Sequence, residues 1–392
     1  MRVDNMVRGL TQAGSVDFFC TISERPDVAA GTAPIPPFLA RLHVHHRPPF
    51  GPSQRGLVRW ARSGWPRAIA WREWADAESA LTAWAEPPYD VVWFSACGSW
   101  VALGQVDRGP AVVDLDNLED QKLRTLMRVA RLQKREGLVR PSPLQRLRRI
   151  LGALLDPVDV RRWERVQQRA ADEAVSVVVA SERDRVQLGH SSAVVVPNGY
   201  ELASTPPAYA PPPEPVFTMV GLLAYPPNID AAQFFARRVL PLVRASLPSA
   251  RFRLVGRSDG SIVSLADLPG VELLGEVDEL DDVFATTTAV VVPLRAGGGT
   301  RLKVLEAFAR KIPVVSTSLG CEGLDARDGF ELLTGETPAE LAAACVRVAV
   351  DTELAAAMAE SGHRLWSSRY RWQDIRLRVR DLAAEAARSR LT

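Results

Sequence analysis

The sequence has few cysteines, no long apolar segment and almost no net charge. Its cysteines, Cys20, Cys97, Cys321 and Cys345, are far apart and lack C-x-x-C spacing, which favours reduced thiols over a disulfide framework. No stretch approaches the roughly 18 uncharged apolar residues of a membrane span, and the N-terminus lacks the apolar core of a signal peptide. With 48 basic and 46 acidic residues the net charge is +2, so global charge argues against nucleic acid as a partner. We expect a cytoplasmic protein.

The amino-acid composition of the chain is that of a globular protein. Apolar residues make up 47% of the chain and charged residues 24%, which excludes a largely disordered chain. At 392 residues the chain exceeds what one hydrophobic core usually supports, so two domains are expected.

Short apolar runs alternate with longer segments of helical periodicity. Continuous apolar strands separated by helices predict parallel sheets covered on both faces. The proline-rich stretch "NGYELASTPPAYAPPPEP" divides two such series. We therefore predict an α/β protein of two doubly wound, Rossmann-like domains facing across a cleft. The expected strands are 16–22, 41–45, 90–94, 111–115, 174–180, 192–197, 216–221, 251–256, 271–275, 289–293 and 313–317, and the helical segments of the first half are 66–86, 119–137 and 160–173.

The beginning of the chain departs from this pattern. "RVDNMVRGL" reads as a helix, whereas a doubly wound domain normally opens with a strand and a phosphate-facing loop. We expect that the opening strand is missing, through a start codon placed too far downstream or a chain made without it.

A glycine corner stands between an apolar run and an amphipathic segment in "VVVPLRAGGGTRLKVLEAFARKIPVVST", residues 290–317. A strand to Pro293, a glycine loop and a helix to about Arg310 would place unpaired helix-start N–H groups beside a backbone without Cβ atoms. Such a corner binds phosphate or diphosphate, because the donors and the helix dipole both point at the anion. The residues of this corner are Gly297, Gly298, Gly299 and Thr300.

Charged residues follow the corner on the predicted helix. Arg301 and Lys303 would supply positive charge, and the carboxylate of Glu306 could accept hydrogen bonds from the hydroxyls of a ribose. Alternatively, the spacing of Lys303, Glu306 and Arg310 is that of a solvated helix face. The P-loop pattern is absent, and a position late in the second domain disfavours a dinucleotide fingerprint.

These residues carry a resemblance to a known family. "VVPLRAGGGTRLKVLEAFARKIPVVSTSLGCEGLDARDG" resembles the donor-site region of the group 1 glycosyltransferases, family four of the retaining enzymes with the GT-B fold. "VSVVVASERD", "VVVPNGYE", "VGLLAYPPNIDAAQFFARRVLPLV" and "GVELLGEVDELDDVFATTTAVVVPL" match further segments in the family's order, so that the resemblance covers about residues 170–340.

The resemblance implies transfer of a sugar from a nucleotide diphosphate sugar, with retention, to a glycan or lipid-linked acceptor in cell-surface polysaccharide or glycoconjugate synthesis, and no cofactor or required metal. It implies that Gly298, Gly299 and Thr300 bind the diphosphate, that Arg301 and Lys303 neutralise it, and that Glu306 holds the ribose. The base would lie near Glu276 and Val277. It also implies an acceptor-side domain at 1–205, a donor domain at 206–375 and a last helix, 376–392, packed on the first domain.

One departure from the family pattern leaves a second function open. Many members carry a glutamate eight positions before the one matched by Glu306, and Gly298 stands there in this chain. The alternative is a protein of the same fold that binds a nucleotide sugar without transferring it.

Three other patterns have plainer explanations. "DLDN" (114–117) resembles a metal-binding D-x-D, but its place between a strand and a helix favours helix capping or acceptor contact. In "HVHH" (43–46), His43 and His45 should share one strand face, without a cysteine or carboxylate nearby to complete a zinc site. The basic, leucine-rich segment 140–169 could lie on an anionic membrane at its inner face, or could be a core-packed helix with a solvated basic face.

Overall fold

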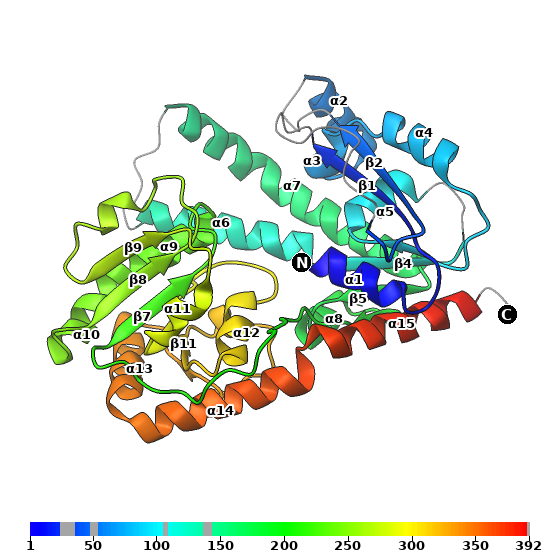
Figure 1. Cartoon of the computed structure of the whole chain (residues 1–392). Coiled ribbons are helices and arrows are strands. Elements are labelled where there is room, and N and C mark those ends of the chain that lie inside the picture. The colour runs from blue at the N-terminus through cyan, green and yellow to red at the C-terminus, as the bar shows by residue number, and fades with distance from the viewer. Residues whose placement is uncertain (24–35, 48–53, 105–108, 136–142, 390–392) are drawn as a thin grey trace. The chain divides into compact units, whose positions relative to one another are not determined.

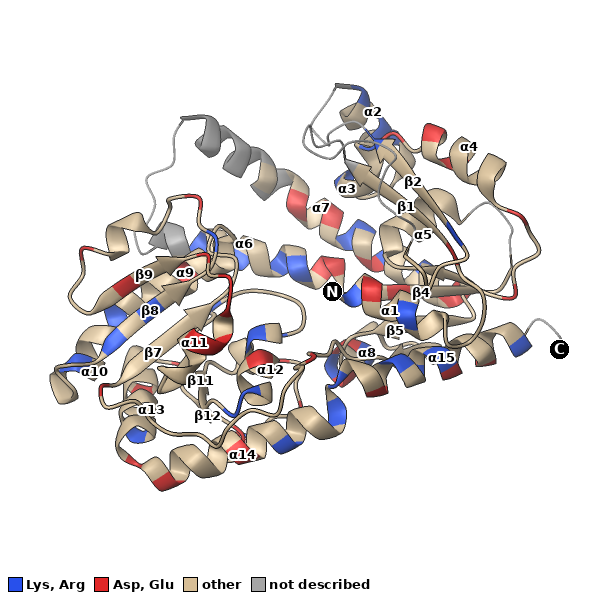
Figure 2. Ribbon diagram, in the orientation of Figure 1, with Lys and Arg blue, Asp and Glu red and all other residues tan. Residues whose placement is uncertain are grey.

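The computed structural model describes residues 1–23, 36–47, 54–104, 109–135 and 143–389. Helices and strands alternate along these ranges, and the chain divides into two compact units (Figure 1). Unit 1 comprises Met1–Leu123, Pro141–Pro197 and Gln373–Thr392, and unit 2 comprises Arg124–Arg140 and Asn198–Trp372. Basic and acidic residues both occur along helices such as α14 (Thr352–Arg369) and α15 (Trp372–Arg388), in keeping with the near-neutral composition (Figure 2).

Unit 1 holds two separate parallel sheets among its described residues, one of β1 and β2 and one ordered β3-β4-β5-β6. Its strands are β1 (Asp17–Ser23), β2 (Arg41–Arg47), β3 (Val92–Phe94), β4 (Ala111–Asp116), β5 (Ser176–Val179) and β6 (Ala193–Val195). Its helices, besides most of α15, are α1 (Arg2–Leu10), α2 (Gln54–Ser63), α3 (Arg67–Ala70), α4 (Ala75–Trp84), α5 (Cys97–Leu103), α7 (Pro143–Glu173) and α8 (Glu182–Leu188), while α6 (Glu119–Arg135) contributes to both units.

Helix α1 is fixed to this unit at both of its ends. The buried guanidinium of Arg2 donates to Asp114 on β4, with Nη2 2.8 Å from Oδ1, and to the carbonyl of Val196. At the other end Gly9 lies against Val379 of α15, so closely that a Cβ there would be 2.8 Å from the valine Cβ. The predicted helix at the start of the chain is thus present and packed.

Unit 2 is built on a six-stranded parallel sheet ordered β12-β11-β10-β7-β8-β9. Its strands are β7 (Val216–Val220), β8 (Arg251–Val255), β9 (Val271–Gly275), β10 (Ala289–Val292), β11 (Val314–Ser316) and β12 (Leu333–Thr334). Its helices, besides α14, are α9 (Pro226–Phe234), the π-helical turn η1 (Phe235–Val239), α10 (Leu240–Ser246), η2 (Val263–Leu265), α11 (Leu280–Ala285), α12 (Leu302–Ala309), η3 (Leu319–Cys321) and α13 (Pro338–Val350).

The strand order of unit 2 locates its binding edge. Counted within the unit, the order is 6-5-4-1-2-3, which is the 3-2-1-4-5-6 order of the doubly wound nucleotide-binding fold. The order reverses between β7 and β10, which pair in parallel. Ligands of such sheets bind outside the carboxyl ends of the strands at this switch point. The loops that follow β7 and β10 are therefore where a site is expected.

The α/β architecture with parallel sheets is confirmed. Every apolar run predicted as a strand overlaps a strand of the structure, and the two strands on either side of the switch point, β7 and β10, are buried throughout. The predicted helix 66–86 is two helices, α3 and α4, and the two-residue strand β12 was not predicted. In the described part of the chain, no helix is long and apolar enough to cross a membrane.

Candidate functional site

The glycine corner follows β10 at the switch point. β10 ends at Val292 and α12 begins at Leu302, and the loop between them requires glycine at two positions. Gly297 has φ +148° and Gly299 has φ +85°, conformations that L-residues rarely adopt. The strand, loop and helix predicted from the sequence are present with nearly the predicted bounds.

The loop presents free backbone donors. Within the described residues, no group accepts a hydrogen bond from the N–H of Gly298, Gly299 or Thr300. These donors lie directly before the N-terminus of α12, where the helix dipole favours negative charge. Donors and dipole together make a site for phosphate or diphosphate.

The loop after β7 meets the corner through Lys303. The Lys303 Nζ donates to the Oδ1 of Asn228 on α9 at 2.8 Å, and Asn228 donates in turn to the Leu222 carbonyl at 2.8 Å. Gly221 lies beside this ammonium, since a Cβ there would be in van der Waals contact with Nζ at 3.5 Å, and its φ of +147° is one that L-residues rarely adopt. The switch point thus gathers a cation from α12 and glycine backbone from both loops.

The charge of Lys303 is held in a poorly hydrated place. Burial lowers the pKa of Lys303 to about 8, the positive charge of Arg301 adds to the lowering, and the carboxylate of Glu306 opposes it. A diphosphate bound beside the ammonium would restore the charged form.

Arg301 is placed differently from Lys303. Its side chain is 5% exposed, and the guanidinium donates to the carbonyl of Gly297 at 3.0 Å and lies 3.8 Å from Glu322 Oε2. In this conformation Arg301 holds the loop by its own carbonyls. Its charge remains beside the corner, while the guanidinium donates to the carbonyl oxygens of Gly297 and Gly298.

Glu306 lies one turn further along α12, and it is not part of a solvated face. The side chains of Glu306 and Arg310 are only 15% and 13% exposed. Burial raises the pKa of Glu306, while a hydrogen bond from Tyr200 and the charges of Arg310 and Lys303 oppose the rise. The solvated-face interpretation of this helix is therefore wrong.

Val277 lies at the same edge of the sheet as the corner. It follows Gly275, where β9 ends, is partly buried, and packs against the core of unit 2. The neighbouring strand end is tightly packed as well, because a Cβ on Gly256 would lie 1.9 Å from the Gly221 carbonyl oxygen. The ends of β7, β8 and β9 thus form a continuous small-residue edge next to the corner.

Sequence analysis missed a buried ion pair that supports the corner. Asp230 of α9 has no exposed side-chain surface, and Arg295 donates to both of its oxygens, with Nη2 2.8 Å from Oδ1 and Nε 3.0 Å from Oδ2. The Arg295 guanidinium also lies 4.5 Å from the ring centre of Phe234. The pair joins α9 to the loop after β10 and fixes the start of the glycine segment.

The other patterns of the sequence lie in unit 1. Asp114 of "DLDN" forms a salt bridge with Arg2. The N–H of Glu119, the first residue of α6, donates to Gln167 Oε1 at 2.7 Å. His43 and His45 share a strand face as predicted, and His43 stacks on Phe19 with ring centres 5.0 Å apart. Among the described residues no group of three or more His, Cys, Asp or Glu could hold a metal ion.

The basic segment 140–169 forms most of α7. Residues 140–142, and the side chains of Leu147, Ile150, Leu151 and Leu154, lie outside the described part of the structure. The described part near its C-terminal end, which includes Trp163 and Val166, packs in the core of unit 1.

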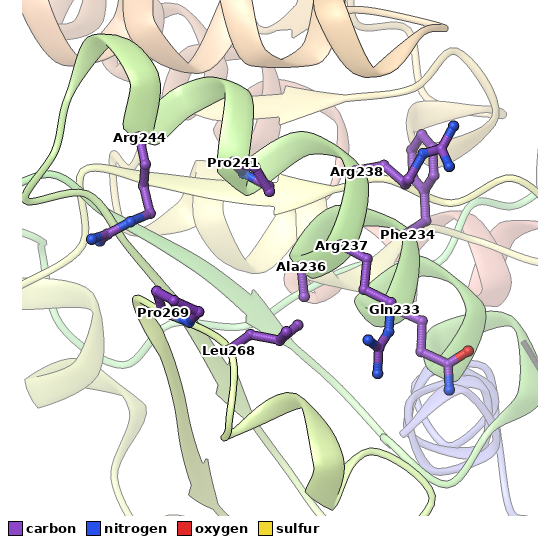
Figure 3. Close-up of a pocket in the computed structure, with 9 residues that line it drawn as sticks. All are labelled: Gln233, Phe234, Ala236, Arg237, Arg238, Pro241, Arg244, Leu268 and Pro269. Atoms are coloured by element: carbon purple, nitrogen blue, oxygen red, sulfur yellow. The ribbon is translucent and has the colours of Figure 1, made fainter.

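A separate pocket of about 500 Å³ lies along the helix that runs from α9 into α10 (Figure 3). None of its lining residues belongs to the glycine corner, and three of them are arginines. They are Gln233, Phe234, Ala236, Arg237, Arg238, Pro241, Arg244, Leu268 and Pro269. Arg244 Nη1 donates a hydrogen bond to the Ala250 carbonyl oxygen at 2.6 Å.

Comparison with known proteins bears on the unit that carries this site. Residues 214–351 match the family model of the group 1 glycosyl transferases. The match includes β7, β10, the corner and α12. A curated relative, an uncharacterized 44.6 kDa protein in the cps region of Klebsiella pneumoniae, is 27% identical over 123 residues, which cover 29% of this chain and 32% of the relative.

Solved structures resemble the chain over most of its length. Sucrose-phosphate synthase of Thermosynechococcus elongatus is 18% identical with a TM-score of 0.68, over 98% of this chain and 92% of that one. Anabaena HepE in complex with UDP-glucose is 16% identical with a TM-score of 0.59, over 89% and 87%. TarM of S. aureus, in complex with fondaparinux, α-GlcNAc-glycerol and UDP, is 12% identical with a TM-score of 0.56, over 78% and 57%.

At these identities the likeness shows the fold alone. The fold is the GT-B type with two Rossmann-like domains, as the resemblance of the sequence implied. The group 1 model adds a family match within unit 2, over residues 214–351.

Proposed function

We propose that this protein is a retaining glycosyltransferase that moves a sugar from a nucleotide diphosphate sugar to a glycan or lipid-linked acceptor. The observation that carries the proposal is the glycine corner itself. In the described part of the chain nothing accepts a hydrogen bond from the N–H groups of Gly298, Gly299 and Thr300, and the cation of Lys303 lies at the same switch point of a doubly wound sheet. The match to the group 1 model spans the same residues.

In the proposed reaction the corner stabilises the departing diphosphate. Negative charge grows on the nucleotide diphosphate as the bond to the sugar breaks, and donors already in place stabilise that charge without reorganisation. Lys303 supplies a full charge to this centre, and Arg301 keeps the loop in shape through the Gly297 carbonyl. Glu306 accepts bonds from the ribose hydroxyls, and the segment at Val277 lies beside the base.

The donor we would test first is UDP-glucose, because HepE was solved with it and TarM with UDP. The acceptor belongs to cell-surface polysaccharide or glycoconjugate synthesis in this proposal. The proposed reaction uses neither a metal ion nor an organic cofactor, since backbone donors and Lys303 would stabilise the negative charge of the diphosphate.

The test follows the fate of the donor. Incubation of the protein with UDP-glucose should release UDP slowly to water and faster with an acceptor, and proton NMR should show the transferred glucose with the anomeric configuration of the donor. Release with inverted configuration would overturn the retaining mechanism. Saturable donor binding without release, across a panel of glycan and lipid-linked acceptors, would instead support the alternative of a binding protein, for which Gly298 in place of a carboxylate is the motivating residue.

A further inference from the structure

Tyr200 lies in a short segment whose backbone is fixed on one side. Its N–H donates to the Tyr370 carbonyl at 2.9 Å, and its carbonyl accepts a bond from the Trp366 Nε1 at 3.1 Å. A β-bridge to Arg371 completes the attachment. Because its backbone is held by α14 and the residues after it, the position of the tyrosine ring is set from outside the corner.

The side chain of Tyr200 is aimed at Glu306. Its hydroxyl donates to Glu306 Oε1 at 2.9 Å and accepts from the Nη1 of Arg310 at 2.6 Å. A phenol has one hydrogen and a guanidinium can only donate, so the bond from Arg310 directs that hydrogen to the carboxylate. Arg310 is held in turn by Asp281, with Nε 2.7 Å from Oδ1.

This arrangement occupies one oxygen of Glu306 and leaves the other. Within the described residues no group donates a hydrogen bond to Glu306 Oε2. A carboxylate that is fixed through Oε1 can offer Oε2 in one direction, whereas an unfixed one must lose rotational freedom when a ligand binds.

A second residue of the same segment holds the corner. Asn198, two residues before Tyr200, is buried and donates from Nδ2 to the Thr300 Oγ1 at 2.8 Å. The segment 198–200 therefore contacts both the diphosphate-facing loop and the proposed ribose-binding carboxylate.

We propose that Tyr200 is a positioning residue for Glu306, which holds Oε1 so that Oε2 meets the ribose hydroxyls, and that it sets the preference for ribonucleotides over 2′-deoxyribonucleotides. This inference rests on the proposed function, since it requires a nucleoside diphosphate at the corner. A fixed charged acceptor discriminates against a ligand that lacks the matching hydroxyl, because its desolvated oxygen is then left unpaired.

The test compares UDP with 2′-deoxy-UDP by titration calorimetry on the wild type, Tyr200→Phe and Tyr209→Phe. The wild type should bind UDP about tenfold more tightly than 2′-deoxy-UDP, as expected for a hydrogen bond to a charged group. Tyr200→Phe should lose most of this ratio, mainly by weaker UDP binding. Tyr209→Phe is the matched control, because its hydroxyl donates to the Thr288 carbonyl and the ratio should stay at the wild-type value.

The pH dependence separates positioning from a general loss of structure. The bond from Tyr200 opposes the rise in the pKa of Glu306, so its removal should raise that pKa further. The loss of UDP affinity on acidification should then begin at higher pH in Tyr200→Phe than in the wild type. A merely structural role would weaken binding without moving this limb.

The outcomes distinguish the inference from the proposed function. If neither UDP nor GDP binds the wild type, the proposed function and the inference both fail. If UDP binds and Tyr200→Phe keeps both the ribose ratio and the acid limb, only the inference fails. Should Tyr200→Phe not fold, Arg310→Met removes the bond that directs the tyrosine hydrogen, and an unchanged ribose ratio in that variant would overturn the inference equally.

Discussion

Lys303 of α12 donates to Asn228 of α9 at 2.8 Å, across the point where the strand order of unit 2 reverses. The contact joins the helix after β10 to the helix after β7. It holds the Lys303 ammonium at the switch point, on the helix that follows the glycine corner, where it would supply positive charge to the proposed diphosphate site.

Removal of this ammonium should weaken nucleotide binding. We expect Lys303→Met to raise the dissociation constant of UDP about 10- to 100-fold, the range for a hydrogen bond to a charged group. Titration calorimetry measures it directly. Lys311→Met is the control, because Lys311 pairs instead with Glu360 at 2.7 Å and should bind UDP like the wild type.

Affinity for UDP should depend on pH through Lys303. In the free protein the pKa of Lys303 is lowered to about 8, and a bound anion favours the charged form of the side chain. The contribution of Lys303 to binding is therefore complete below about pH 8, and above it the affinity weakens by up to about tenfold per pH unit, because each binding event then takes up a proton. Lys303→Arg stays charged and should give a nearly flat profile between about pH 7 and 9. A wild-type profile as flat as that of the arginine variant would contradict this role.

The conformation of the loop should matter more for binding than for stability. Gly299→Ala forces an alanine into φ +85° and should cost about 1–2 kcal/mol of unfolding free energy. Gly260→Ala imposes the same strain at φ +89° in the loop after β8, where a Cβ would meet nothing within 4 Å. Both variants should lose similar stability in urea unfolding, but only Gly299→Ala should lose UDP affinity. Equal UDP binding by the two would remove the loop from the site.

The buried pair of Asp230 and Arg295 should behave as one unit. Arg295→Met removes the guanidinium that donates to both oxygens of the fully buried Asp230 carboxylate, and we expect a loss of about 3–5 kcal/mol of stability. The double variant Asp230→Asn with Arg295→Met should lose clearly less than the sum of the two single losses. Urea unfolding of the four proteins makes this comparison, and additive losses would show that the pair is not coupled.

The sequence allowed the corner to be predicted because its signals are local. Glycines at 297–299 between a buried strand and an amphipathic helix dictate a backbone turn whatever surrounds it. The same holds for the strand and helix series that predicted parallel sheets. The short strand β12 escaped because two residues fall below the length at which a pattern can be recognised.

The partners of the corner could not be predicted, because they are distant in the chain. Tyr200 and Glu306 are 106 positions apart, Asn228 and Lys303 are 75 apart, and Asp230 and Arg295 are 65 apart. A single sequence carries no signal for such pairs. Arg301 shows the same limit at short range, since only the structure shows that its guanidinium donates to the Gly297 carbonyl.

The measurement that tests the central claim most directly is a thermal-shift panel of UDP, GDP, ADP and their sugar conjugates on the wild type and Glu306→Ala. A ligand at a hundredfold excess over its dissociation constant stabilises the folded state by about 2.7 kcal/mol. We predict that one nucleoside diphosphate raises the melting temperature of the wild type and that Glu306→Ala reduces this shift. No shift with any of these nucleotides, or an equal shift in both proteins, would contradict a nucleotide diphosphate sugar bound at the glycine corner with its ribose on Glu306.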